Sequence, residues 1–249
     1  MGNILSMKVG EAYLKSRSTE LAEDIWNLKH QGQVVDTSDR EYISWVNSLS
    51  VFLECVHQAE LDDVYIVFEM KTPMSNKAID VLLLGYSAKK EERILIVELK
   101  QWGRILTKNV YTPDKVYVPE VNASRKHPFR QLNLYEDNLR NHHSGIQKKF
   151  EEGEEVKFGK IAYLHNFADR ESLFTDQYKK WERYEKCIFG GGNQEKQRLI
   201  RLLKGSFVSE SNDELLAVLK DYEAVMGDEG LAGLRKAYNN EASCKMKED

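Results

Sequence analysis

The sequence predicts an α/β domain whose core elements follow the order α-β-β-β-α-β, with a mixed central sheet and helical additions at both ends. Four apolar segments have the length and composition of strands, namely "VYIVFEM", "AIDVLLLGY", "ILIVELK" and "GKIAYLHNF". Apolar residues at helical spacing precede the first of these and separate the third from the fourth. A chain of 249 residues with 41% hydrophobic residues can bury one sizeable core.

The helices before the strands follow from apolar stripes in polar surroundings. Residues 10–30 are highly charged and predict an N-terminal helix that buries Tyr13, Leu21, Ile25 and Trp26. A second helix is expected to begin near Ser38. Its buried stripe repeats at helical spacing and consists of Trp45, Leu49, Phe52, Leu53 and Val56.

The strands are expected at 64–70, 78–86, 94–100 and 159–167. In the first, the alternation puts Val64, Ile66, Phe68 and Met70 on one face. Residues 103–127 predict a short hairpin or flap, and Pro128 opens the helix that follows it. We expect one domain over residues 1–170 and a helical extension over 171–249, a candidate docking region for a partner.

Composition limits the classes of function. The formal net charge of −4 gives no global basic signature for nucleic acid, although a local groove stays compatible with it. No apolar segment approaches the roughly 18 residues of a membrane span, so no membrane is expected. Three cysteines, far apart in the chain and with no CxxC pair, predict a reducing cytoplasmic location.

Two charged residues interrupt an otherwise apolar strand in "RILIVELKQW". Because side chains alternate along a strand, Glu98 and Lys100 share the face of Ile94 and Ile96. One interpretation is a solvated strand end with a weak surface ion pair. The other is a functional site, to which the preceding strand contributes Asp80.

Asp80 lies near the start of the most apolar strand in the chain, where an isolated carboxylate would be costly to bury. Antiparallel pairing of 78–86 with 93–100 brings the start of one strand beside the end of the other, so Asp80 and Glu98 can converge. Two close carboxylates repel unless a cation lies between them. Oxygen ligands of this kind suit Mg²⁺ or Mn²⁺.

This pattern resembles the PD-(D/E)XK nuclease superfamily: Asp80, then Glu98, Leu99 and Lys100, on neighbouring strands. Ile79 stands where the proline of the motif would be. In "QLNLY", Gln131 and Tyr135 are one helical turn apart and resemble the Q-x-x-x-Y element of the RecB-like branch. The resemblance implies a restriction-endonuclease-like fold, and an ordinary amphipathic helix is the competing interpretation of "QLNLY".

Residues 15–170 are similar to the nuclease-type domain that precedes superfamily-1 helicase domains in bacterial proteins. "LIVELKQW" followed by "HPFRQLNLY" carries most of this likeness. It implies that Asp80, Glu98 and the Leu99 carbonyl hold Mg²⁺ or Mn²⁺ and that Lys100 acts on the attacking water or the transition state. Gln131 and Tyr135 would orient the DNA strand.

Helices of this family often supply a further acid, and Glu41 matches that position. The alternative for Glu41 is a capping box, because Ser38 to Glu41 reads S-x-x-E. Glu69 is a weaker candidate for the same cleft.

The resulting expectation is a Mg²⁺-dependent deoxyribonuclease that acts with a helicase or ATPase partner in DNA processing or anti-phage defence. The alternatives are a DNA-binding or scaffolding domain of the same fold without cleavage, and a structural subunit that binds no DNA. The sequence leaves open whether the substrate is DNA or RNA, single or double stranded, and cut at ends or internally. A homo-oligomer and the role of residues 190–249 also stay open.

Overall fold

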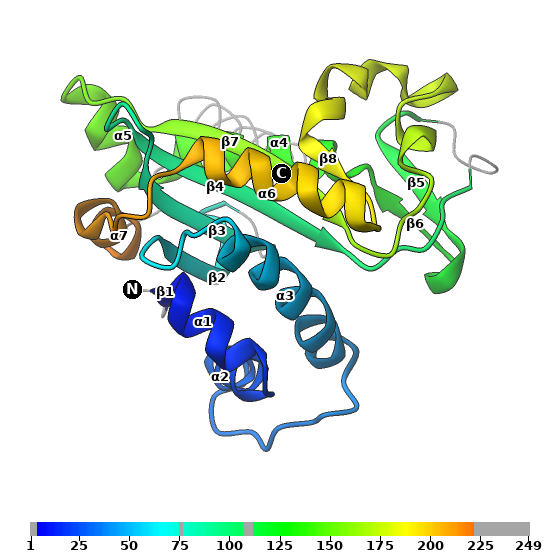
Figure 1. Cartoon of the computed structure of the whole chain (residues 1–249), viewed down its shortest axis with the longest axis horizontal. Helices are drawn as coiled ribbons and strands as arrows, with labels where there is room; N and C mark the ends of the chain where they lie inside the picture. Colours follow the sequence, from blue (N-terminus) through cyan, green and yellow to red (C-terminus); the bar gives the residue numbers. More distant parts are fainter. Residues whose placement is uncertain (1–3, 75–76, 107–111, 222–249) are drawn as a thin grey trace, which may run out of the picture.

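The computed structural model describes residues 4–74, 77–106 and 112–221, and its centre is a mixed six-stranded sheet (Figure 1). The strand order is β1-β2-β3-β4-β7-β8. The pairs β1–β2, β2–β3 and β3–β4 are antiparallel, whereas β7 is parallel to both β4 and β8. The strands are β1 (Leu5–Lys8), β2 (Tyr65–Lys71), β3 (Ala78–Tyr86), β4 (Glu92–Lys100), β7 (Lys157–Leu164) and β8 (Ile188–Phe189).

One face of the sheet is covered by the helices α1 (Val9–Ser16), α2 (Glu20–Lys29), α3 (Arg40–Gln58) and α6 (Asn193–Ser206), whose apolar sides join one core cluster. The single helix expected over residues 10–30 is wrong. The chain breaks between α1 and α2, where the Ser18 hydroxyl accepts a hydrogen bond from the Glu20 amide. Serine side chains that bond the local backbone compete with helical hydrogen bonds in this way. Strand β1 was not predicted either.

The opposite face carries α4 (Pro128–His142), α5 (Ser144–Glu151) and α7 (Asp213–Lys220), which pack on the second core cluster. The expected hairpin is confirmed as β5 (Lys115–Val118) and β6 (Ala123–Lys126), joined by the 3₁₀ turn η1 (Pro119–Val121). The core order α3-β2-β3-β4-α4-β7 agrees with the predicted α-β-β-β-α-β order and mixed sheet. Within the described ranges, no helix has both the length and the hydrophobicity needed to cross a bilayer.

Side chains alternate between the two faces of the sheet along β2 and β3, and this alternation breaks in both strands at the level of Glu69 and Asp80. Val67 and Met70 join the core cluster under α4, whereas Phe68 joins the cluster under α3. The expectation that Met70 shares a face with Phe68 is therefore wrong. Glu69, between them, has φ 48°, a left-handed conformation that costs a non-glycine residue on the order of 1–3 kcal/mol. Such strain often marks a functional position.

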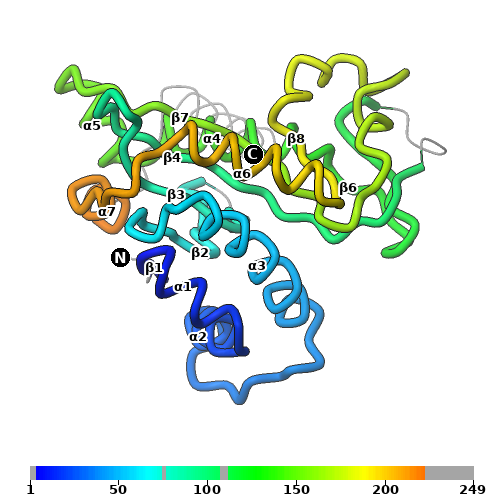
Figure 2. The backbone as a smooth tube through the Cα atoms, in the orientation of Figure 1, coloured from blue at the N-terminus to red at the C-terminus, as the bar shows by residue number. Residues whose placement is uncertain are grey.

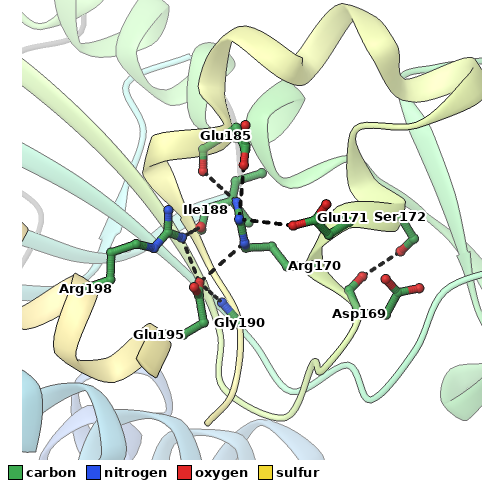
Figure 3. A network of polar contacts seen from close by, with 9 residues as sticks. All are labelled: Asp169, Arg170, Glu171, Ser172, Glu185, Ile188, Gly190, Glu195 and Arg198. Atoms are coloured by element: carbon green, nitrogen blue, oxygen red, sulfur yellow. Dashed lines mark hydrogen bonds and ion pairs between the residues drawn. The ribbon is translucent and has the colours of Figure 1, made fainter. Parts of the chain in front are cut away.

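The segment after β7 folds back beside the sheet through η2 (Arg170–Leu173) and η3 (Asp176–Cys187) (Figure 2). An ionic network fixes it: Arg170 contacts Glu185 at 3.1 Å and Glu195 at 3.5 Å (Figure 3). Gly190 and Gly191 allow the close approach, because a Cβ there would lie 2.6 and 2.5 Å from carbonyl oxygens of residues 167 and 165. The division of the chain at residue 170 stays a prediction.

Candidate active site

Strands β3 and β4 separate at the level of Asp80 and Glu98. Their ladder runs from Tyr86 opposite Glu92 to Val81 opposite Val97. Beyond that point β3 remains paired with β2 as far as Ala78, and β4 remains paired with β7 as far as Lys100. The next two positions of the ladder, Asp80 and Glu98, therefore face each other across the opening of a fork.

Asp80 uses this opening to satisfy a backbone donor. The Leu99 amide donates to Asp80 Oδ2 at 2.7 Å, in place of the strand partner that β3 no longer supplies. Glu98 is fully buried, and its Oε2 has no hydrogen-bond partner among the described residues. Burial and the nearby Glu98 carboxylate raise the pKa of Asp80 to about 7, and burial also raises that of Glu98.

Lys100 compensates this charge only partly. Its ammonium forms an ion pair with Glu98 Oε1, and its side chain is 19% exposed. Burial acts to lower the pKa of Lys100, but Glu98 and Asp80 outweigh it and the net pKa is raised. The solvated strand end considered from the sequence is therefore wrong, because this pair lies inside the protein.

A half-buried lysine–glutamate pair elsewhere in the protein shows what is unusual here. Lys160, equally 19% exposed, pairs with Glu136 under α4. Burial acts to raise the pKa of Glu136, but Lys160 and Arg140 outweigh it and leave a lowered pKa. Glu98 keeps a raised pKa despite its own lysine, since it is more deeply buried and other carboxylates lie nearby. The fork therefore holds excess negative charge.

On the α3 side, Lys29 connects two further acids. Its ammonium lies 2.8 Å from Glu41 Oε2 and 3.0 Å from Glu69 Oε2. The Trp45 indole donates to Glu69 Oε1 at 2.9 Å. Burial and the Asp80 charge raise the pKa of Glu69, which stands between the pairs Phe68–Val81 and Met70–Ile79 and so opposite Asp80.

The capping box considered for Glu41 is wrong. The N-cap of α3 is Asp39, whose carboxylate accepts from the Glu41 amide at 2.7 Å, while the Ser38 amide and hydroxyl bond Asp36. The Glu41 side chain is 61% exposed and pairs with Lys29 instead.

From α4, Gln131 donates to the Tyr135 hydroxyl at 2.6 Å, and that hydroxyl donates to the Ala78 carbonyl at 2.8 Å. Ala78 lies two residues before Asp80, so this chain of hydrogen bonds ties α4 to the start of β3. Burial and the charges of Glu98 and Asp80 raise the pKa of Tyr135, which therefore remains a neutral donor.

All these side chains line one cavity of about 580 Å³. The lining includes Lys29, Glu41, Glu69, Asp80, Glu98, Leu99, Lys100, Gln131 and Tyr135. The cavity thus brings together every site residue predicted from the sequence. Lys29 and Gln101 were missed. Gln101, which bonds Ser44 and Ser48 of α3, stands in "LIVELKQW" but was given no role there, and no motif marks Lys29.

One side of the cavity is basic. Arg40, Lys71 and Lys77 line it, and the hairpin strand β6 adds Arg125 and Lys126 nearby. Burial, followed by the neighbouring charges of Lys77 and Arg130, lowers the pKa of Lys126. Cations that repel one another in this way favour a bound polyanion.

The histidines near the motifs have structural roles. His127 caps α4 by accepting from the Phe129 amide, and its Nε2 lies 3.1 Å from the Leu173 carbonyl. His143 is fully buried and caps α5. His165 lies 3.2 Å from the Ser48 hydroxyl.

The donor set fits a hard divalent cation with few protein ligands. In the part of the chain that the structure describes, no group of three or more His, Cys, Asp or Glu side chains is placed to hold a metal ion. Magnesium commonly takes only one or two carboxylates and keeps several waters. The unpartnered Glu98 Oε2, with Asp80 across the fork, meets that smaller requirement.

Comparisons of the chain with protein-family models, with curated proteins and with solved structures find no match.

Proposed function

We propose that this protein is a divalent-cation-dependent nuclease of the PD-(D/E)XK type, with a restriction-endonuclease-like core, that hydrolyses phosphodiester bonds of DNA. The observation that carries the proposal is the fork between β3 and β4. It holds Asp80, Glu98 and Lys100 in one cavity with a buried, unpartnered carboxylate oxygen.

Asp80, Glu98 and the Leu99 carbonyl are the groups that would hold Mg²⁺ or Mn²⁺. Such an ion supplies positive charge to the scissile phosphate and lowers the pKa of a water nucleophile. The fork favours its binding, because burial and the neighbouring Glu98 carboxylate raise the pKa of Asp80 to about 7, and a bound cation would offset both effects.

Lys100 would act on the reacting phosphate. Its raised pKa keeps it an ammonium at neutral pH. In this role it donates hydrogen bonds to the attacking water or to the oxygens that gain charge in the transition state. Trp102, whose ring centroid lies 5.6 Å from the ammonium, limits where the side chain can move.

Gln131 and Tyr135 would hold the substrate strand in register with the fork. The Tyr135 hydroxyl donates to the Ala78 carbonyl at the start of β3, and Gln131 donates to that hydroxyl, which fixes the position of both; both line the cavity. The basic side, with Lys77 and Lys126, supports a phosphate backbone as the ligand, since affinity for nucleic acid comes largely from such contacts.

A DNA-binding domain without cleavage is the second candidate. The ion pair between Lys100 and Glu98 favours it, because one ligand oxygen of Glu98 is already occupied. Both candidates bind DNA, whereas a structural subunit would not.

A nicking time course on supercoiled plasmid, with Mg²⁺ or Mn²⁺, separates these possibilities when it is run beside a gel-shift titration. Single-stranded DNA and RNA serve as further substrates. We expect metal-dependent cleavage by the wild type and its loss in Glu98→Gln. The matched control is Glu136→Gln, which removes the charge of a half-buried glutamate from a lysine pair outside the cavity.

Binding without cleavage on every substrate would leave the binding domain as the function. Absence of both binding and cleavage would leave the structural subunit. Equal loss of cleavage in the two variants would show that Glu98 acts through stability rather than chemistry.

The resemblance also suggests a helicase or ATPase partner, DNA processing or anti-phage defence, and a cytoplasmic location; these remain proposals. The docking role expected for residues 171–249 also stays a proposal, and residues 222–249 of this segment lie outside the described ranges.

A further inference from the structure

A lysine between two acids occupies the α3 side of the cavity. Lys29, in the last turn of α2, contacts Glu41 and Glu69 at 2.8 and 3.0 Å, and its ammonium lies 4.9 Å from the centroid of the Trp45 ring. Its side chain is 24% exposed and that of Glu69 is 11% exposed. This contact is therefore largely shielded from water, unlike an ordinary surface pair.

The fold fixes Lys29 in this position. Ile25 and Trp26, one turn earlier on α2, are buried in the core beside α3, so the last turn of the helix projects toward the end of β2. Ile25 itself lines the cavity. A lysine at position 29 thus reaches the acids without leaving its own helix face.

The carboxylates of Glu69 and Glu98 differ in whether both of their oxygens already have a partner. Glu69 has a protein partner on each oxygen, Trp45 on Oε1 and Lys29 on Oε2. Glu98, by contrast, has a buried oxygen with no partner among the described residues. The capacity to accept a cation is consequently concentrated at the fork, on the β4 side.

We propose that Lys29 is a built-in cation that takes the place of a second divalent ion, so that the cavity binds a single ion, at Asp80 and Glu98. The inference rests on the proposed function, because it assumes that the fork binds a divalent ion. It adds that Glu41 and Glu69 share Lys29 as their cation and are not metal ligands.

The physical reason is charge balance. Glu41, Glu69, Asp80 and Glu98 carry four potential negative charges around one cavity, and the two lysines that form ion pairs with these acids, Lys29 and Lys100, supply two positive charges directly against them. One divalent ion completes the balance. Without Lys29, the pair Glu41 and Glu69 would be left with two uncompensated charges, which a second divalent ion can neutralise.

The test counts bound ions. Mn²⁺ titration followed by electron paramagnetic resonance, with isothermal calorimetry for Mg²⁺, is done on the full chain, on Lys29→Met and on Lys29→Gln. We expect one ion in the wild type and two in both variants. Without metal, we expect both variants to have a lower melting temperature than the wild type. On adding Mg²⁺, their melting temperatures should rise by more than that of the wild type.

Lys15→Met is the matched control. Lys15 lies between Asp24 and Glu11, at 2.7 and 3.6 Å, with a side chain that is 30% exposed, and it does not line this cavity. Its loss also leaves two carboxylates without their lysine, yet the number of bound ions should stay at one. Lys29→Gln retains a hydrogen-bond donor and serves if the methionine variant does not fold.

Two ions in the wild type, or one ion in both Lys29 variants, would overturn the inference and leave the proposed function intact. A second ion gained equally by Lys15→Met would also overturn it, because the effect would then not be specific to the cavity. No bound ion in the wild type would overturn the metal-dependent function, and this inference with it.

Discussion

Glu98 is fully buried, and its environment determines what this carboxylate can do. Burial and neighbouring acids raise its pKa, whereas the comparable Glu136 keeps a lowered one. Both have a lysine partner. The difference lies first in burial, which is complete for Glu98, and then in the local excess of carboxylates at the fork, where Glu69 and Asp80 lie near Glu98. An excess of this kind is the electrostatic condition for binding a metal ion.

Lys100→Met tests the transition-state role. We expect Mg²⁺-dependent nicking to fall by roughly 10²- to 10³-fold, as when a donor to transition-state charge is removed. DNA affinity should change only a few fold, because one phosphate contact is a small part of binding. The measurement is a nicking time course beside a gel-shift titration.

The stability of Lys100→Met should also fall. An exposed strand-end lysine, as the sequence suggested, would contribute little, but Lys100 pairs with a fully buried glutamate. Removing one partner of a buried pair costs about 3 kcal/mol or more. Lys160→Met is the control, with equal exposure and a similar partner. If it lost cleavage to the same degree, the effect of Lys100→Met would be one of folding.

Glu41→Gln tests whether Glu41 is a catalytic acid, as the family resemblance implies, or serves only as an ion-pair partner of Lys29. The Glu41 side chain is 61% exposed, and pairs of this exposure contribute about 0–1 kcal/mol. We therefore expect nicking within about fivefold of the wild type and an unchanged number of bound ions. A loss near 10²-fold would assign Glu41 the catalytic role.

At the scale of elements, the site depends on where strands stop pairing. β3 leaves β4 after Val81, and the hydrogen-bond donor freed on Leu99 is taken by Asp80. The helix α4 holds the start of β3 through Tyr135. Strand pairing, side-chain capping and helix packing thus act on the same few residues, and the cavity opens where the ladder ends.

The hairpin β5–β6 offers a separate test of DNA binding. Replacing Arg125 and Lys126 by alanine should weaken DNA affinity and lower the slope of log affinity against log salt by up to about two units. Nicking at saturating DNA should remain near that of the wild type, since neither residue touches the fork carboxylates in a hydrogen bond or ion pair among those described. The measurement is a set of gel shifts at several salt concentrations.

Lys148→Ala is the control for the hairpin, since its side chain is 73% exposed on α5, at the opposite end of the sheet from the hairpin (Figure 1). A salt slope that fell equally in both proteins would exclude a specific contribution from the hairpin.

For the whole molecule, two buried histidines predict acid sensitivity. Burial lowers the pKa of His127 and of His143 from 6.5 to about 4. Each is neutral in the folded state. Below pH 6.5 the unfolded chain takes up a proton that the folded protein does not bind until about pH 4. The free energy of unfolding is therefore unaffected by these histidines above pH 6.5 and falls as the pH drops toward 4. A shift of this size corresponds to about 3 kcal/mol per histidine, which is large beside a total stability of about 5–15 kcal/mol.

Urea denaturation between pH 7.5 and 4.5 measures this loss. His127→Asn should retain an N-cap for α4, be less stable at pH 7.5, and show a smaller fall in stability on acidification than the wild type. An equally steep fall in the variant would assign the acid sensitivity to other groups.

The sequence by itself determined the types of most elements. Strand-like runs, the stripe of α3 and the proline at the start of α4 are local signals, which a single chain displays directly. It also determined that Asp80, Glu98 and Lys100 belong to neighbouring strands, and the cavity contains all three. Their chemical roles remain predictions, because residue types alone do not establish a reaction.

Only the tertiary structure decided which charges meet. The fork between β3 and β4, the left-handed Glu69 and the position of Lys29 depend on strand pairing and helix packing between residues far apart in the chain. Lys29 and Glu69 are 40 residues apart, and no local pattern encodes their contact. Burial likewise belongs to the assembled fold, so the Lys100 that looked like a solvated strand end became half of a buried ion pair.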